Sequence, residues 1–468
     1  MPAARKWTNW SARWADRSPA MLARLAILAV TVAAASGCSH PQHLMLTPVG
    51  FDQQGGDPFA HTPAPMRTPP MPLFIAAPRT LAPGNPPAAE VFGTARTDNL
   101  ELGKLRVDFD PGDVPPTWPR LAELSRMDDR PVRPTMAVAA WEPYGPFWTG
   151  AAQLDERKDV DRASRAAFAK AVNAELRASG QRNIYVFVHG FNTGFAHNCG
   201  VAAEMFHYLG RDGVMISYDW PSQDSLFGYS ADKATAGACV RGLRQLLVHL
   251  AHDTDVNRIH LIAHSAGAPI VIEALHELRL MNYRDPADEV RRRYRLGRLA
   301  LVAPDMDLRD FGQAVADMTT SLPERTLLYV SSRDKALDIS AWIAGFARLG
   351  QPLDALTPRQ LEFLQSDANV ELIDVVNAEL HHGSWLGHSY FHEDPWVSSD
   401  LVQCLRYGGD PVARGLRFDE ALRVNVFTDD YPDRARRACR AAVARHDEIM
   451  AAERTTAPTA EPSGPRAK

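Results

Sequence analysis

The sequence is poor in cysteine, with five among its 468 residues. No two of them form a Cys-x-x-Cys pair, which disfavours a zinc ribbon, and no His-Glu-x-x-His stretch offers the zinc ligands of a metalloprotease. Positive charge is not in excess either, because the formal net charge is -5. The first 38 residues hold five basic groups and one acidic group, so the rest of the chain carries -9. These absences disfavour a nucleic-acid partner, and we expect no metal and no other cofactor.

The N-terminus is predicted to be a targeting segment rather than part of the fold. Its apolar run "LAILAVTVAAASGC" ends in small residues and Cys38, and it is too short to favour a membrane span. This ending resembles the lipobox of bacterial lipoproteins, in which the cysteine is lipid-modified. The resemblance predicts a signal peptide over residues 1–38, a lipid anchor at Cys38 and, because Ser39 is not aspartate, an outer-membrane location facing the periplasm. A plain secretory signal is the alternative, and we expect translation to start at Met21.

Three regions are predicted after the signal. Residues 39–70 hold many Pro, Gly and Gln residues and are expected to form a flexible tether. Residues 71–454 are expected to form one α/β domain, because near-continuous apolar runs alternate with amphipathic helical stretches. This pattern indicates a mostly parallel central sheet with helices on both faces, and residues 100–112 alternate well enough for an edge strand. Residues 455–468 have the composition of a disordered tail.

Four cysteines follow the signal segment: Cys199, Cys239, Cys404 and Cys439. Since disulfides persist outside the cytosol, we expect Cys199 to pair with Cys239 and Cys404 with Cys439. Free buried thiols are the alternative interpretation.

One serine follows an expected buried strand at the point where a helix should begin. In "RIHLIAHSAGAPIVIEAL", Ser265 stands between the two elements, although the usual G-x-S-x-G signature of a nucleophile has Ala263 at its first glycine. Binding sites in such sheets form at the carboxyl ends of the strands. In chain order these ends supply Ser265, Asp334 and His388, which is the order of an α/β-hydrolase triad. A serine hydroxyl needs a base, and the base needs an acid, so we expect these three residues to be catalytic.

An oxyanion hole is expected beside this serine. The helix after Ser265 directs its N-terminal N–H groups at the reacting centre, so the N–H of Ala266 is one predicted donor. The second should come from the loop after the strand "NIYVFVHG", where Phe191 is best placed. His189 in the same loop is expected to brace it rather than to react.

Six stretches together resemble a known family: "VFVHGFNTGF", "SYDWPSQDSLFGYSADK", "IHLIAHSAGA", "LVAPDMD", "LLYVSSRDKALDIS" and "LGHSYFHEDPWVSSDL". Their order and spacing are similar to those of the bacterial α/β-hydrolase family called DUF900, over about residues 72–401. The resemblance implies the α/β-hydrolase fold, the triad of Ser265, Asp334 and His388, and cleavage of a carboxylic ester or related acyl bond in a small substrate. The family usually has methionine where this chain has Ala266, which would alter the pocket shape and leave the backbone donor in place.

Alternatives remain open for the acid, the base and the activity. Asp305 or Asp307 is a rival acid one strand earlier, with loop or helix capping as their ordinary role. Three other histidines compete with His388 as the base: His381, His382 and His392, the last being second choice. The rival activities are those of a lipase, a thioesterase or a peptidase, and a non-catalytic envelope binding protein on a hydrolase scaffold is the alternative to an enzyme.

Overall fold

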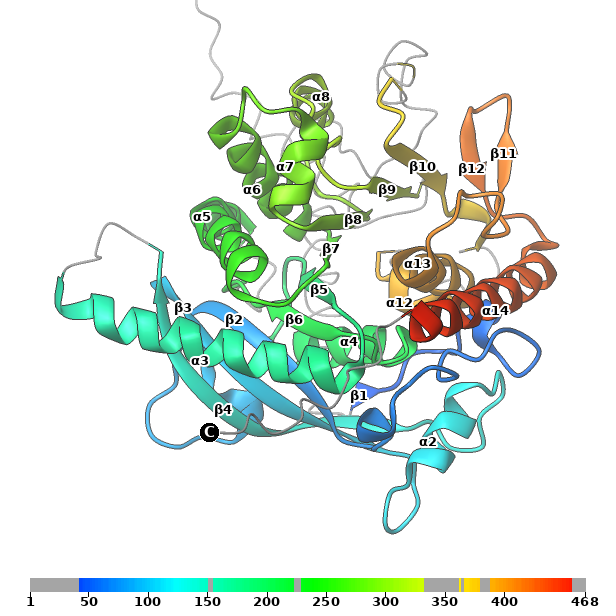
Figure 1. The fold of residues 1–468 in the computed structure, drawn as a ribbon, viewed down its shortest axis with the longest axis horizontal. Coiled ribbons are helices and arrows are strands. Elements are labelled where there is room, and N and C mark those ends of the chain that lie inside the picture. The colour runs from blue at the N-terminus through cyan, green and yellow to red at the C-terminus, as the bar shows by residue number, and fades with distance from the viewer. Residues whose placement is uncertain are drawn as a thin grey trace, which may run out of the picture.

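The computed structural model describes residues 42–149, 155–222, 229–331, 362, 366–378 and 388–456. Twelve strands in this part of the chain form one sheet, in the order β1-β4-β3-β2-β6-β5-β7-β8-β9-β10-β12-β11 (Figure 1). The strands are β1 (Gln42–His43), β2 (Met71–Leu81), β3 (Phe92–Asp110), β4 (Thr135–Trp148), β5 (Asn183–Val188), β6 (Val214–Tyr218), β7 (Arg258–His264), β8 (Leu296–Val302), β9 (Arg325–Val330), β10 (Val370–Asp374), β11 (Arg417–Asp419) and β12 (Val424–Val426).

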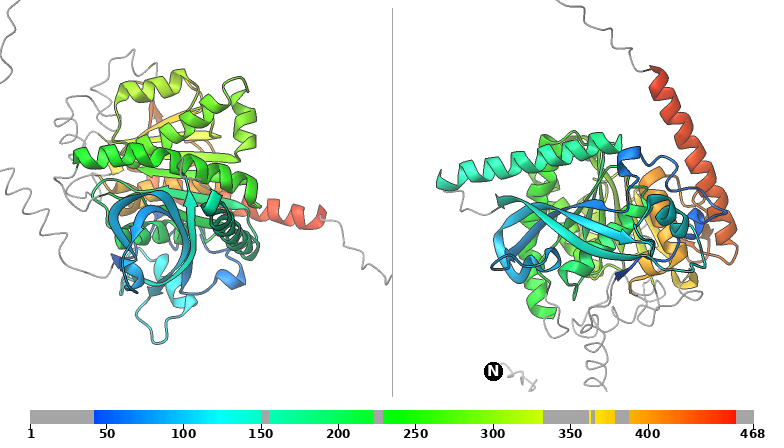
Figure 2. Two further views of the ribbon diagram at one scale, coloured as in Figure 1. Left: turned by 90° about the vertical axis from the view of Figure 1, so that its left-hand side faces the viewer. Right: turned by 90° about the horizontal axis from the view of Figure 1, so that it is seen from below.

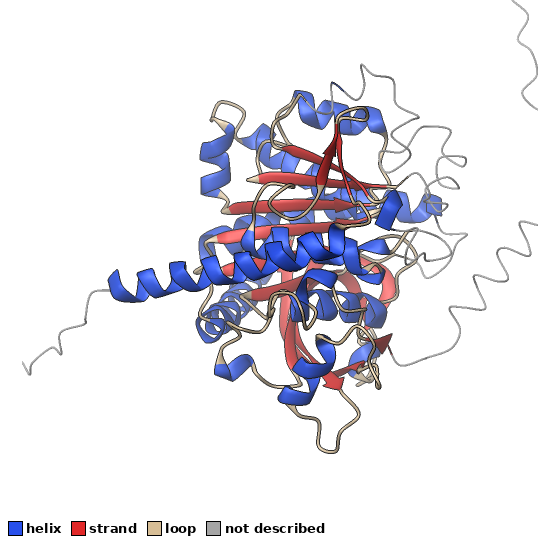
Figure 3. Cartoon of the chain, turned by 90° about the vertical axis from the view of Figure 1, so that its right-hand side faces the viewer, coloured by secondary structure: helices blue, strands red, loops and turns tan. Residues whose placement is uncertain are grey.

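The sheet is parallel from β2 through β12 and antiparallel at its two ends. β1, β4, β3 and β2 pair antiparallel at one end, and β11 pairs antiparallel with β12 at the other. The parallel strands follow one another across the molecule in Figure 3. The predicted mostly parallel sheet is confirmed, but the edge position of residues 100–112 is wrong, because β3 lies between β2 and β4.

Helices cover both faces of the sheet, as the sequence predicted (Figure 1). The described helices are α2 (Trp118–Ser125), α3 (Asp155–Ser179), α4 (Phe195–Tyr208), α5 (Tyr229–Asp253), α6 (Gly267–Met281), α7 (Ala287–Arg293), α8 (Leu308–Ala316), α12 (Tyr390–Glu393), α13 (Pro395–Tyr407) and α14 (Tyr431–Thr456). α3, α5, α6, α7 and α8 contribute to the core on one face, and α4, α12, α13 and α14 to the core on the other. None of the described helices is long and apolar enough to cross a membrane.

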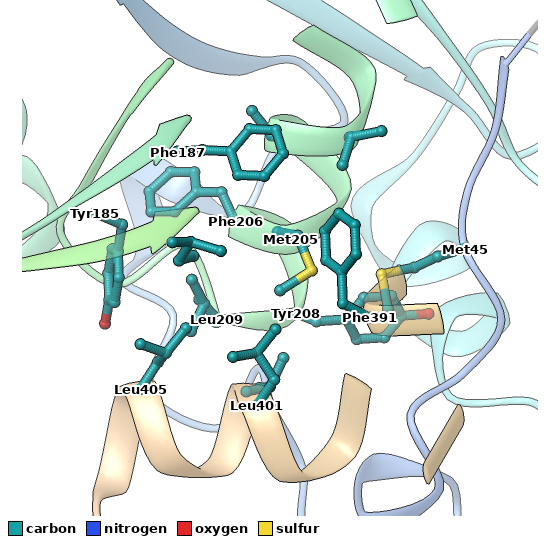
Figure 4. Packing of buried hydrophobic residues seen from close by; sticks show 14 of the residues in the cluster. Met45, Tyr185, Phe187, Met205, Phe206, Tyr208, Leu209, Phe391, Leu401 and Leu405 are labelled. Carbon is teal, nitrogen blue, oxygen red and sulfur yellow. The ribbon is translucent and has the colours of Figure 1, made fainter. Parts of the chain in front are cut away.

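Strand β5 shows how one run of apolar residues serves both cores. Its side chains alternate between the two faces, so Ile184 and Val186 join one core while Tyr185 and Phe187 join the other. The ring of Tyr185 lies 6.5 Å from that of Phe206 on α4, and the ring of Phe187 lies 6.0 Å from that of Phe391 (Figure 4). A strand buried on both faces is apolar at most of its positions, which explains why these runs were visible in the sequence.

The predicted tether over residues 39–70 is wrong from Gln42 onward. Leu44 and Phe51 are fully buried and belong to the same core as α4 and α13, and Met45 packs there too (Figure 4). The amide of Gly50 donates a 2.9 Å hydrogen bond to the Ser399 hydroxyl of α13. The Pro- and Gly-rich composition of the segment favours irregular backbone, but its apolar side chains pack into the core beside α4 and α13. This segment is therefore part of the domain.

The C-terminal boundary also differs from the prediction. α14 continues to Thr456 and projects from the body at its end (Figure 2), so the first two residues of the expected tail are helical. Residues 457–468 and the predicted signal over residues 1–38, including Cys38 and Met21, lie outside the described residues.

The predicted disulfides are wrong, because all four described cysteines are free and buried. Cys199 belongs to the core on one face of the sheet and Cys239 to the core on the other, so the sheet separates their sulfur atoms. Cys439 instead donates a hydrogen bond from Sγ to Oε1 of Gln403 at 3.3 Å. Burial raises the pKa of the Cys239 thiol to about 12, which makes that thiol a poor nucleophile.

Candidate active site

Ser265 occupies the turn between β7 and α6 in a left-handed backbone conformation, with φ 51°. Such a conformation is uncommon for a residue with a side chain. Its amide donates to the carbonyl of Val302 on β8 at 3.0 Å, and its carbonyl accepts from the amides of Ala268 at 3.0 Å and Asp305 at 3.1 Å. Bonds to β8, α6 and the loop after β8 thus hold the strained serine in place.

Glycines on two elements make room for this turn. A Cβ added at Gly267 would lie 2.4 Å from the carbonyl oxygen of Val188, so α6 starts in direct contact with the end of β5. A Cβ added at Gly190 would lie 2.9 Å from Cβ of Ser265. The loop after β5, which carries the predicted donor Phe191, therefore touches the serine. Ala266 is the N-cap of α6, where the helix dipole favours negative charge.

His388 lies next to this turn through its contact with His264, the residue before the serine. The two imidazole rings are 4.9 Å apart between centroids, and Nε2 of His264 is 3.1 Å from the carbonyl oxygen of His388. Burial, followed by the nearby imidazole of His388, lowers the pKa of His264, so the neutral ring donates its Nε2 proton to that carbonyl. His388 thus contacts the residue that precedes Ser265.

Two of the three candidate acids, Asp305 and Asp307, lie in the described part of the chain. Asp334 lies outside the described residues, which reach Ser331 at the end of β9 before the gap. The rival Asp307 is the N-cap of α8, and its Oδ1 accepts from the amide of Arg309 at 2.8 Å, so its capping role is confirmed. Asp305 is buried after β8, and its amide bonds to the carbonyl of Ser265.

The rival base His392 has a different partner. Its Nδ1 lies 2.8 Å from Oε1 of Glu204 on α4, and Oε2 of Glu204 accepts from the amide of Met45 at 2.7 Å. Burial lowers the pKa of His392, but the hydrogen bond and charge of Glu204 outweigh this and raise it overall. The pair of His392 with Glu204 therefore links α12, which follows His388, to α4. His381 and His382 lie outside the described residues.

The loop after β5 rests on buried polar groups that the sequence did not reveal. Nε2 of His189 lies 3.3 Å from Oδ1 of Asp219, and Arg79 on β2 pairs with the other oxygen of Asp219 at 2.6 Å. Asn192 has φ 55°, and its amide donates to the hydroxyl of Ser222 at 2.7 Å. Sequence reasoning missed Arg79 and Asp219, because strand pairing brings them together from positions 140 residues apart.

Comparisons with known proteins give a family and several structural neighbours, three of which are described below. A family model described as an alpha/beta hydrolase of unknown function, DUF900, matches residues 164–405. No curated protein matches the chain.

The structural neighbours are described as esterases or as lipase-esterase related. Esterase B from Lactobacillus rhamnosis in an inhibited form is 13% identical with a TM-score of 0.28, over 58% of this chain and 80% of that one. Another structure of the same esterase is 14% identical with a TM-score of 0.27, over 48% and 75%. A lipase-esterase related protein from Clostridium acetobutylicum is 14% identical with a TM-score of 0.22, over 57% and 94%.

Proposed function

The chain belongs to the DUF900 family of α/β hydrolases, and on that premise we propose that it is a serine hydrolase of a carboxylic ester or related acyl bond. The triad is Ser265, His388 and Asp334. The observation that carries this proposal is the conformation of Ser265, whose φ of 51° is held by hydrogen bonds from three elements. Strained residues persist only where their surroundings enforce them, and they cluster at active sites.

In the proposed reaction, Oγ of Ser265 attacks the carbonyl carbon while His388 takes its proton and Asp334 orients the imidazole. The amides of Ala266 and Phe191 stabilise the oxyanion. The tetrahedral intermediate then expels the alcohol, which receives the proton from His388, and leaves an acylated serine. His388 next deprotonates a water molecule, which attacks the acyl carbon; the second tetrahedral intermediate releases the acid as His388 returns the proton to Oγ of Ser265. The cycle uses no cofactor.

A fluorophosphonate probe, which reacts with activated serines, tests the nucleophile. We expect the wild-type protein to be labelled at Ser265 and the variant Ser265→Ala to remain unlabelled. Ser331→Ala is the matched control, because Ser331 is a buried serine at the end of β9, and it should still be labelled. Labelling of Ser265→Ala at the wild-type level would contradict the proposal.

A panel of p-nitrophenyl esters with acyl chains of increasing length separates the related activities. A preference for long chains indicates a lipase, whereas silence across both panel and probe indicates a binding protein on a hydrolase scaffold. The same assay identifies the acid, because removal of the triad carboxylate lowers kcat by about 10⁴. We expect that loss in Asp334→Asn and a much smaller one in Asp305→Asn.

We further propose that the mature protein is a lipoprotein of the cell envelope, anchored at Cys38 and facing the periplasm from the outer membrane. The support is the "LAILAVTVAAASGC" segment. Each buried methylene of an acyl chain contributes about 0.8 kcal/mol to membrane attachment. Cys38→Ser should therefore move the protein from the membrane fraction to the soluble fraction, and retention in the membrane fraction would count against the anchor.

A further inference from the structure

Behind the proposed oxyanion loop lies a buried chain of charged groups. Arg79 of β2, Asp219 after β6 and His189 after β5 are at most 2% exposed. Nε of Arg79 is 2.6 Å from Oδ2 of Asp219, and Oδ1 of Asp219 is 3.3 Å from Nε2 of His189. The side-chain amide nitrogen Nδ2 of Asn198 on α4 donates to Oδ1 of Asp219 at 2.6 Å. Burial would raise the pKa of Asp219, but Arg79, His189 and Asn198 lower it overall, so the carboxylate is ionised.

The two ring nitrogens of His189 both face acceptors. Nδ1 lies 2.8 Å from the carbonyl oxygen of Gly190, which can only accept, so this nitrogen carries a proton. Nε2 lies 3.3 Å from Oδ1 of the Asp219 carboxylate. The indole of Trp220 stacks on the ring with centroids 5.3 Å apart and planes 9° from parallel, so packing holds the plane of the imidazole.

The carbonyl of Gly190 belongs to the same peptide unit as the N–H of Phe191. A trans peptide is planar, so its C=O and N–H point in opposite directions. A proton donated by His189 to the carbonyl oxygen therefore fixes the direction of the Phe191 N–H. It also draws electron density from the amide, and hydrogen bonds in such chains strengthen one another.

We propose that Arg79, Asp219 and His189 are positioning residues that orient and polarise the Gly190–Phe191 peptide for oxyanion binding. The inference rests on the proposed function. The His189 imidazole acts on the oxyanion through the Gly190–Phe191 peptide, and Arg79 acts on His189 through Asp219. We call these three residues the Arg79–Asp219–His189 relay. Arg79 lies on β2, outside residues 164–405 that match the family model.

The rival account is that His189 only fills space and supports Trp220. The indole N–H of Trp220 donates to the carbonyl of His189 at 2.8 Å, and Arg79 donates to the carbonyl of Trp220 at 2.8 Å. These bonds use no part of the His189 imidazole. The two accounts therefore differ only in what the Nδ1 proton does.

Two substitutions at one position separate them. In His189→Asn the amide nitrogen takes roughly the place of Nδ1, so the bond to Gly190 is kept. In His189→Gln it takes roughly the place of Nε2, so only the contact to Asp219 is kept. Removing an oxyanion donor lowers turnover on the order of 10²–10³-fold. We expect kcat for a p-nitrophenyl ester to fall by this factor in His189→Gln and by less than about tenfold in His189→Asn, with KM within a few-fold in both.

Equal losses of kcat in the two variants would overturn the inference, as would losses that appear only in KM. Fluorophosphonate labelling at Ser265 is measured first, because its absence in the wild-type protein refutes the proposed function itself rather than the relay. If either variant fails to fold, the wild-type protein decides by ¹⁵N NMR of its histidines, with His189 assigned through contacts to the Trp220 indole. A protonated Nδ1 is expected, and an unprotonated Nδ1 would overturn the inference.

Discussion

Gly267→Ala tests whether the contact between α6 and β5 sets the position of the nucleophile. The added Cβ would lie 2.4 Å from the carbonyl oxygen of Val188 and 2.7 Å from that of His189, whereas ordinary contact begins at 3.4 Å. Both oxygens are backbone atoms in the centre of the sheet, so the start of α6 must yield by about 1 Å. Misplacement of a reacting group by about 1 Å costs on the order of 10²-fold in rate.

The effect on stability should be smaller than the effect on rate. Alanine in a helix is favoured over glycine by about 1 kcal/mol, while overpacking of a tight core costs about 1–3 kcal/mol. These two contributions leave Gly267→Ala destabilised by at most about 2 kcal/mol. We therefore expect a folded protein with kcat for a p-nitrophenyl ester reduced about 100-fold.

The matched control is Gly237→Ala in the interior of α5. No atom lies within 4 Å of a Cβ added there, so this variant should gain about 1 kcal/mol in free energy of unfolding and keep the wild-type kcat. Stability is measured by urea denaturation and kcat by ester hydrolysis. A Gly267→Ala protein with kcat within threefold of the control would refute the idea that this contact positions Ser265.

Three more predictions follow from the packing and the charges. Phe51→Ala should lower the free energy of unfolding by about 3–5 kcal/mol in denaturant titrations. A change below about 1 kcal/mol would instead support a flexible tether over residues 39–70. Glu204→Gln should lower the melting temperature most at about pH 5.5. Because the pKa of His392 is raised in the folded protein, its pair with Glu204 stabilises the fold fully below pH 6.5, and this stabilisation is lost as the pH rises through the folded-state pKa. A loss of melting temperature that grows toward pH 8 would contradict this. Unfolding without reductant should make all four described cysteines available to iodoacetamide, and protection of any pair, seen by mass spectrometry, would indicate a disulfide.

The sequence was sufficient for the parts of the fold that are buried on two faces. Strands such as β5 are apolar along nearly their whole length, and the helices between the strands carry one apolar side, so the hydrophobic pattern predicts the order of elements. Ser265 could be located because it stands where one such strand meets one such helix. Chain order also predicted His388, and its carbonyl oxygen lies 3.1 Å from Nε2 of His264.

Other features depend on contacts between distant segments and have no local signal. Residues 42–70 lack a regular period, yet Phe51 is fully buried and its ring lies 6.4 Å from that of Tyr407. The cysteine pairs were chosen by closeness along the chain, which does not reveal that Cys199 and Cys239 lie on opposite faces of the sheet. The Arg79–Asp219 pair arises from the parallel pairing of β2 with β6. The sequence of neither segment alone indicates this register.

The departure from G-x-S-x-G at Ala263 has a physical explanation in the same geometry. Ala263 is the next-to-last residue of β7 and lies level with Val188 of β5, in regular strand pairing that a methyl group does not disturb. The close approaches occur after the strand ends. Gly267 lies against the carbonyl oxygens of Val188 and His189, and Gly190 lies against Cβ of Ser265. A strained residue costs about 1–3 kcal/mol, and the bonds to Val302, Ala268 and Asp305 hold Ser265 in that conformation. The glycines that the turn requires are thus Gly267, which follows Ser265, and Gly190, which follows β5. The G-x-S-x-G motif covers only the segment around the serine and therefore does not include Gly190.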